Sequence, residues 1–137
     1  MTQRYNKQQI FDIGIRNTIK QNGPAWDQRE NCCSYLDREG KQCHIGVFMS
    51  KYLCENIGPI GYLGKFAVGF AEWINDTFDD DISIKFLSDF QAVHDDKTFL
   101  VVSGEITLDE WFAGYRERCI QFASDYVLNP DVTTEIP

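Results

Sequence analysis

Long apolar runs are missing from this sequence. None of its 137 residues fall in a stretch approaching the roughly 20 apolar residues that a membrane-spanning helix needs, so we expect no membrane partner. The N-terminal residues have no apolar core behind their charges, which predicts no secretion signal. Basic residues are also scarce, because 13 Lys and Arg stand against 21 Asp and Glu for a net charge of −8. Nucleic-acid binding depends on clustered cations, so we expect no nucleic acid as a partner.

The usual signatures of metal, calcium and phosphate sites are missing as well. No Cys-x-x-Cys pair occurs among the five cysteines, which disfavours a structural zinc site. The acidic run 79–81 lacks the spacing of a calcium loop, and the glycines of 58–64 lack the Gly-Lys-Ser/Thr ending of a phosphate loop. We therefore expect no metal and no cofactor. The odd, dispersed cysteines also favour a reduced cytoplasmic protein over a disulfide scaffold.

Apolar and aromatic residues are plentiful enough to form one core. The chain is 43% hydrophobic and 14% aromatic, which is typical of a folded domain of ordinary size. No repeat or low-complexity linker divides it. We predict a single globular domain over residues 1–128 and a loosely ordered C-terminal tail over 129–137.

Three longer helices are indicated by apolar residues at intervals of three and four. The first spans 7–21 and stops at Asn22-Gly23-Pro24. The second follows the acidic run 79–81, whose carboxylates are placed to cap it. The third opens with Thr107-Leu-Asp-Glu110, a capping box, and carries Cys119 on its apolar face. Shorter helices are predicted over 50–57 and 65–75.

The segments 31–35 and 42–48 are predicted to form a β-hairpin. They contain Tyr, Val, Ile and Phe, and the turn Asp37-Arg38-Glu39-Gly40 joins them. The run 99–102 is predicted to be either a third strand or a buried loop. The expected fold class is therefore α+β, a single small domain of four to five helices packed around a short β-hairpin with a possible third strand. Whether Cys33 and Cys43 form a disulfide across the hairpin or stay as buried thiols is left open.

Two sequence blocks resemble a group of small, uncharacterised proteins of phages and prophages. The first is Cys33-x-Tyr35-x4-Gly40-x2-Cys43-x2-Gly46, and the second is Leu87-x2-Phe90-Gln91-x2-His94-Asp95. They cover about a third of the chain in the order that the group shows. Members of the group usually carry Lys where this chain has Gln42. The resemblance implies a phage protein acting in the host cell cytoplasm, with no established activity.

The leading functional hypothesis is a phage accessory binding protein that counteracts host defence. It would sequester a nucleotide-like signal or inhibit a host protein, because no catalytic set stands out in the sequence. For a small ligand, phosphate favours cations and a base favours an aromatic ring. The candidate ligand-binding residues are Tyr35, Arg38, Lys41, His44 and His94.

Two other classes of function stay open. A small hydrolase or transferase would use His94 with a nearby Cys or Asp. Cys43 and His44 are less suited to a dyad, since neighbours on a strand point to opposite faces. A structural or assembly protein would use exposed aromatic residues such as Trp26 or Tyr62 as interface anchors, and this class predicts a homo-oligomer.

Overall fold

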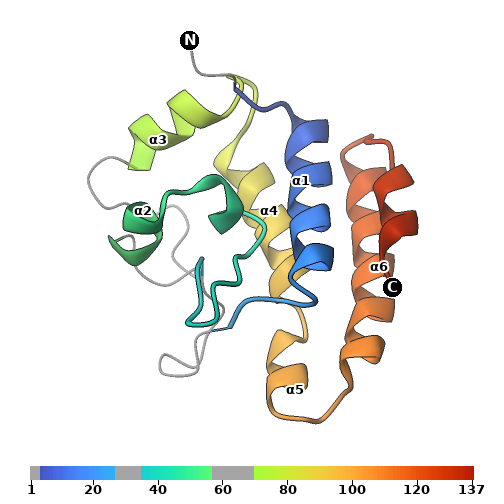
Figure 1. Cartoon of the computed structure of the whole chain (residues 1–137). Helices are drawn as coiled ribbons and strands as arrows, with labels where there is room; N and C mark the ends of the chain where they lie inside the picture. The colour runs from blue at the N-terminus through green and yellow to red at the C-terminus, as the bar shows by residue number, and fades with distance from the viewer. Residues whose placement is uncertain (1–3, 27–34, 57–69) are drawn as a thin grey trace.

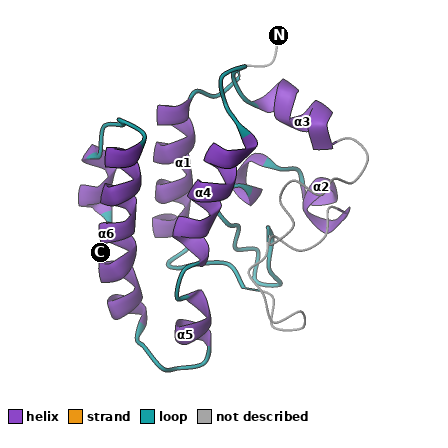
Figure 2. Cartoon of the chain, turned by 180° about the vertical axis from the view of Figure 1, so that it is seen from behind, coloured by secondary structure: helices purple, strands orange, loops and turns teal. Residues whose placement is uncertain are grey.

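The computed structural model describes residues 4–26, 35–56 and 70–137. Within these ranges the protein is built from helices and loops (Figure 2), in the order that Figure 1 shows. The helices are α1 (Lys7–Lys20), α2 (Lys51–Asn56), α3 (Phe70–Thr77), α4 (Ile84–Asp95), α5 (Thr98–Val102) and α6 (Leu108–Asp125), with the short 3₁₀ helices η1 (Gly46–Phe48) and η3 (Asp131–Glu135). None of the described helices combines the length and apolar character that crossing a membrane requires.

The longest helices begin where the sequence provides caps. Asn6 and Gln9 form a capping box at α1, and Thr107 and Glu110 form the predicted one at α6. At α4 the cap differs from the expectation, because the Ser83 side chain accepts from the Phe86 amide and the acidic run lies further upstream. These caps fix the starts of the three helices that enclose the core.

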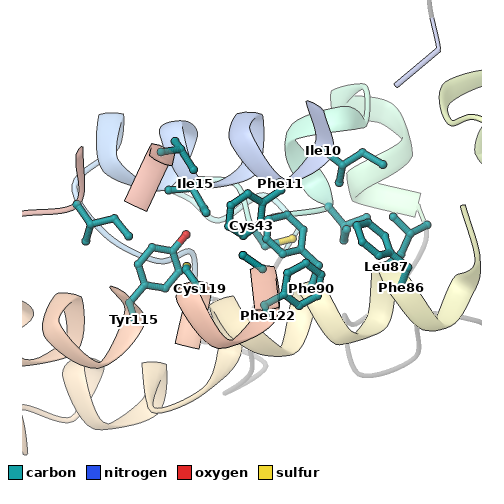
Figure 3. Packing of buried hydrophobic residues seen from close by; sticks show 14 of the residues in the cluster. Ile10, Phe11, Ile15, Cys43, Phe86, Leu87, Phe90, Tyr115, Cys119 and Phe122 are labelled. Carbon is teal, nitrogen blue, oxygen red and sulfur yellow. The ribbon is translucent and has the colours of Figure 1, made fainter. Parts of the chain in front are cut away.

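Helices α1, α4 and α6 pack on one another through phenylalanine side chains (Figure 3). Phe11 from α1, Phe90 from α4 and Phe122 from α6 form a triangle with ring centroids 5.0–5.9 Å apart. All three rings are almost completely buried. Cys119 lies in the same core, as predicted. Burial of this apolar surface is the main source of stability, at about 1.5–3 kcal/mol for each large side chain.

The predicted β-hairpin is wrong for the part of the chain that the structure describes. Residues 27–34, which include most of the expected first strand and Cys33, lie outside the described residues. Of the second strand, only the single antiparallel bridge between Leu36 and Gln42 is present, and the chain then enters η1. The turn itself forms, with Gly40 at φ 86° as expected. The described residues therefore form a helical domain rather than the expected α+β domain.

Side chains on two helices take the hydrogen bonds that a partner strand would have made. The Gln21 amide at the end of α1 binds both the N–H and the carbonyl of Gln42, each at 2.8 Å. On α4, the Gln91 side chain accepts from the Ile45 amide at 3.2 Å. Buried backbone groups need partners, and here glutamines supply them without a sheet. The loop 35–49 is thereby fastened between α1 and α4.

The run 99–102 is helical, so the predicted third strand or buried loop is also wrong. It belongs to α5, which starts at Lys97 in the left-handed region with φ 59°. Thr98 is buried and donates to the His94 carbonyl, while Phe99 stays 49% exposed. β-Branched residues favour strands only weakly when no neighbouring strand is present.

Residues 129–137 are better ordered than predicted. They contain η3, which packs against α1 and α6. Val132 and Ile136 are buried, and the Gln8 side chain binds both the N–H and the carbonyl of Asn129. Two apolar side chains in a polar tail are enough to dock it onto the helices.

The close approach of α1 to α4 makes Gly14 a testable position. A Cβ at Gly14 would lie 2.6 Å from the Phe90 ring, whereas one at Gly114 would meet only the flexible end of Arg118 at 3.1 Å. Alanine is favoured over glycine by about 1 kcal/mol inside a helix. We expect Gly14→Ala to lower the free energy of unfolding by about 1–3 kcal/mol through overpacking, and Gly114→Ala to leave it unchanged or raise it. Urea denaturation of both variants measures this, and equal effects would contradict the packing.

Candidate functional site: a buried histidine pair and an open cleft

The five predicted ligand-binding residues separate into two groups. Tyr35, His44 and His94 are buried, at 2%, 0% and 0% exposure. Arg38 is exposed, Lys41 is half-buried, and both line a surface cleft. The five residues therefore do not share one cavity: Arg38 and Lys41 line the cleft, and their role in binding a ligand stays a prediction. The first group lies in the core, where a ligand in the cleft does not reach.

His44 is held by hydrogen bonds at both ring nitrogens. Nδ1 lies 2.9 Å from the Phe90 carbonyl, which only accepts, so Nδ1 carries the proton. Nε2 then accepts from the Tyr115 hydroxyl on α6. The ring also stacks on Phe90 with centroids 4.0 Å apart. Burial lowers the pKa of His44 well below its ordinary value, and the neighbouring His94 lowers it further.

His94 is also neutral by its hydrogen bonds, and its partners are different. Nε2 accepts from the Ala25 amide at 3.0 Å, so Nε2 carries no proton. Nδ1 faces the Asp95 carboxylate at 2.8 Å and donates to it. The His44 and His94 rings meet edge to face with centroids 5.4 Å apart. The loop 35–49 thus packs against α4, the helix that carries His94.

Tyr35 and Cys43 lie together on the buried side of the loop 35–49. The Tyr35 hydroxyl is buried without a hydrogen-bond partner among the described residues. The Cys43 sulfur accepts from the Gly46 amide at 3.1 Å, and burial raises the pKa of the Cys43 thiol far above its ordinary value. A thiol in this setting is a packed apolar group and a poor nucleophile. Gly46 is required here, since a Cβ would lie 2.0 Å from the Tyr35 carbonyl oxygen.

The cleft has a volume of about 360 Å³ and lies between the turn 37–41 and helix α5. This volume is at the small end of the roughly 300–1,000 Å³ of ligand pockets. One wall is apolar and comes from α5, the start of α6 and Trp26, whose ring lies 6.0 Å from that of Phe99. The described residues that line the cleft are Asn22, Pro24, Trp26, Asp37, Arg38, Glu39, Lys41, Val101, Val102 and Leu108.

The described cleft lining carries two carboxylates and two cations, and these four groups are paired unequally. The Asp37 carboxylate accepts from the amides of Glu39, Lys41 and Trp26, so its charge is spread over three N–H groups. Glu39 pairs with Lys41 at 3.5 Å. Arg38 has no ion pair or hydrogen bond among the described residues, although the chain as a whole carries −8. The guanidinium is therefore the one cation of the described cleft lining without a counter-charge.

Sequence reasoning found the polar side of the cleft and missed the apolar side. Arg38 and Lys41 belong to a turn that the sequence marks clearly. Val101 and Val102 were placed in a strand or buried loop, and Trp26 was considered only as an interface anchor. The sequence gives no sign that α5 and the turn 37–41 line one cleft, because the two segments are far apart in sequence and come together only in the folded chain.

Some sites are not formed within the described ranges. No three His, Cys, Asp or Glu side chains come together there in a way that would hold a metal ion. Comparison of the chain with protein-family models, curated proteins and solved structures gives no match. The resemblance to phage proteins consequently stays a prediction.

The buried His44 predicts a pH-dependent stability. Its pKa is lowered on folding, so the unfolded chain binds the extra proton first as the pH falls below about 6.5. The contribution to stability is complete above that pH and is lost toward acid, at up to about 1.4 kcal/mol for each pH unit. Denaturant unfolding between pH 7.5 and 4.5 measures the slope. We expect His44→Gln to have a shallower slope than the parent, and equal slopes would contradict the assignment.

Proposed function

We propose that this protein is a binding protein that sequesters a small nucleotide-like molecule in the cleft between the turn 37–41 and α5. The observation that carries the proposal is that Arg38, which has no ion pair among the described residues, lines the same cleft as a set of apolar and aromatic side chains. Arginine binds phosphate through a planar fork of two N–H groups, which makes it well suited to a phosphorylated ligand. Lys41 is paired with Glu39 at 3.5 Å. A phosphate bound in the cleft would replace the Glu39 carboxylate as the partner of Lys41.

The apolar wall supports an aromatic ligand group. Trp26 is half-buried at the edge of the cleft, and Val101 and Leu108 contribute aliphatic surface. A nucleobase gains roughly 1–3 kcal/mol by stacking on an aromatic side chain, with little dependence on which base it is. One small molecule with a ring and an anionic group fits both sides of the cleft.

Binding is favoured over turnover by the groups available. The described lining residues of the cleft include no thiol, hydroxyl or imidazole. His94 and Asp95 are oriented like the base and acid of a catalytic triad, but Nε2 of His94 is occupied by the Ala25 amide and the ring is fully buried. A protein that holds a signalling molecule without changing it lowers the free concentration of that signal. This is consistent with the proposed counter-defence role, whereas inhibition of a host protein and self-association stay separate hypotheses.

A ligand panel tests the proposal directly. Nucleoside monophosphates, cyclic nucleotides and inorganic phosphate should be added separately and the melting temperature recorded. A ligand at 100 times its Kd stabilises the native state by about 2.7 kcal/mol. We expect at least one nucleotide to raise the melting temperature, and inorganic phosphate alone to raise it less because it lacks the ring.

Matched arginine variants locate the site. Arg38 and Arg16 are both exposed, but Arg16 pairs with Glu135 outside the cleft at 3.2 Å. Arg38→Gln should weaken nucleotide binding at least tenfold while the unliganded melting temperature stays within a degree or two, since Arg38 makes no ion pair or hydrogen bond in the described part of the chain. Arg16→Gln should bind as the parent does. No shift with any nucleotide, or equal binding by both variants, would rule out this cleft as the site.

A further inference from the structure

Within the described residues, the amides of the segment that carries Trp26 donate to side chains. After α1 the chain reverses through Asn22 and Gly23, at φ 60° and 135°, and continues as Pro24-Ala25-Trp26. Proline has no N–H, so this short segment offers two amide donors. The Ala25 amide donates to Nε2 of His94 at 3.0 Å, and the Trp26 amide donates to the Asp37 carboxylate at 3.4 Å.

These two bonds act from opposite sides. Asp37 belongs to the turn at the cleft surface, whereas His94 is completely buried in α4. Ala25 is itself fully buried beside the imidazole. The bond at 3.0 Å is the shorter of the two and is shielded from water. The bond to His94 is therefore the buried anchor of the residue that precedes Trp26 in the cleft lining.

The bond depends on the protonation state of His94. Because Nδ1 donates to Asp95, the lone pair of Nε2 is free to accept from Ala25. A second proton would sit on Nε2 and point at the Ala25 N–H. Two donors then face each other in a buried place, where an unmatched polar group is costly. The 24–26 segment must move away for the proton to be accommodated.

We propose that His94 is the positioning residue of the cleft, and that protonation of His94 releases the 24–26 wall and lowers ligand affinity. The inference rests on the proposed function for its ligand, but its structural part does not need one. It assigns to His94 a role that the sequence resemblance left open. The ligand would be held near neutral pH and released in acid.

The charges around His94 determine how readily it accepts a proton. On α4, Asp95 favours the charged ring at 2.8 Å. From the loop, His44 approaches within 5.4 Å between ring centroids, and the two imidazoles oppose a second charge on one another. From α6, Arg118 disfavours positive charge on His44. The 22–26 segment brings no titratable side chain, and α5 contributes only the Thr98 hydroxyl, which donates to the His94 carbonyl.

Amide hydrogen exchange of the unliganded protein tests the positioning role. The protection of the Ala25 amide should be measured by NMR at pH 7.5 and pH 5.0, with the Gly23 amide as internal reference. Gly23 donates to the Thr18 carbonyl, an acceptor that does not titrate in this range. We expect the protection factor of Ala25 to fall at least tenfold in acid while that of Gly23 changes little. Parallel behaviour of the two amides would overturn the inference.

Variants at both histidines separate the two imidazoles. His94→Gln offers a neutral oxygen acceptor to Ala25, so Ala25 should stay protected at both pH values. His94→Leu removes the acceptor, and Ala25 should exchange quickly at both. His44→Gln is the matched control, and the loss of Ala25 protection in acid should persist in it. A pH effect that persists in His94→Gln would contradict the proposal.

Ligand affinity completes the test, with AMP as the probe. We expect the Kd of AMP to rise between pH 7.5 and 5.0, by a factor at least ten times larger for the parent than for His94→Gln. Comparing the two proteins cancels the titration of the phosphate itself. Equal rises would overturn control of affinity by His94. If AMP binds neither protein while Ala25 follows the predicted exchange pattern, the positioning role stands and the nucleotide proposal fails. If AMP binds but the exchange of the Ala25 amide does not respond to pH, the nucleotide proposal stands and the positioning role fails.

Discussion

The fold depends on how one buried loop satisfies its backbone. Residues 43–46 are buried between α1 and α4, and the described part of the chain offers the loop 35–49 no strand to pair with. Glutamine side chains on the two helices, together with the Cys43 sulfur, take over those hydrogen bonds. Each such bond contributes only about 1 kcal/mol net, but leaving its backbone group unpaired would cost about 1–3 kcal/mol. The loop, and the turn that it carries to the cleft, can therefore occupy only the position in which these side chains reach it.

This constraint explains which parts of the fold were predictable. Helices α1 and α6 are specified locally, by capping boxes and apolar spacing, so their predicted bounds were nearly correct. The turn 37–41 is also local, because Asp37 and Gly40 encode it within five residues. The prediction of the second strand was wrong although its aromatic and β-branched residues satisfy the strand pattern. Its backbone hydrogen bonds go instead to the side chains of Gln21 and Gln91, which are far away in sequence. A glutamine on a helix gives no sign in the sequence of which backbone it will bind.

The same distinction applies to the candidate site. Arg38 is exposed and Lys41 is half-buried in a turn that the sequence marks clearly, and both line the cleft. Their role in ligand binding stays a prediction. The histidines were chosen for their chemistry, but chemistry alone does not distinguish a ligand-binding imidazole from one that joins helices. In His44 and His94 all four ring nitrogens serve internal partners, which leaves none for a substrate. Burial at 0% and 0% was the deciding quantity, and it is a property of the assembled fold.

A neutral histidine is an unusual choice for a purely structural link, because glutamine offers the same acceptor without a proton to gain. In this protein glutamine side chains already make bonds of this kind to the backbone of Gln42, Ile45 and Asn129, so the protein has the alternative available. The imidazoles occur where the loop and the cleft wall meet α4, and both stand within reach of Asp95 or Tyr115 as proton partners. His94 stands behind the cleft wall, whereas His44 joins the loop to α4 and α6 in the core. Under the proposal, His94 links the wall of the cleft to the proton concentration, while the buried His44 links the stability of the whole fold to it.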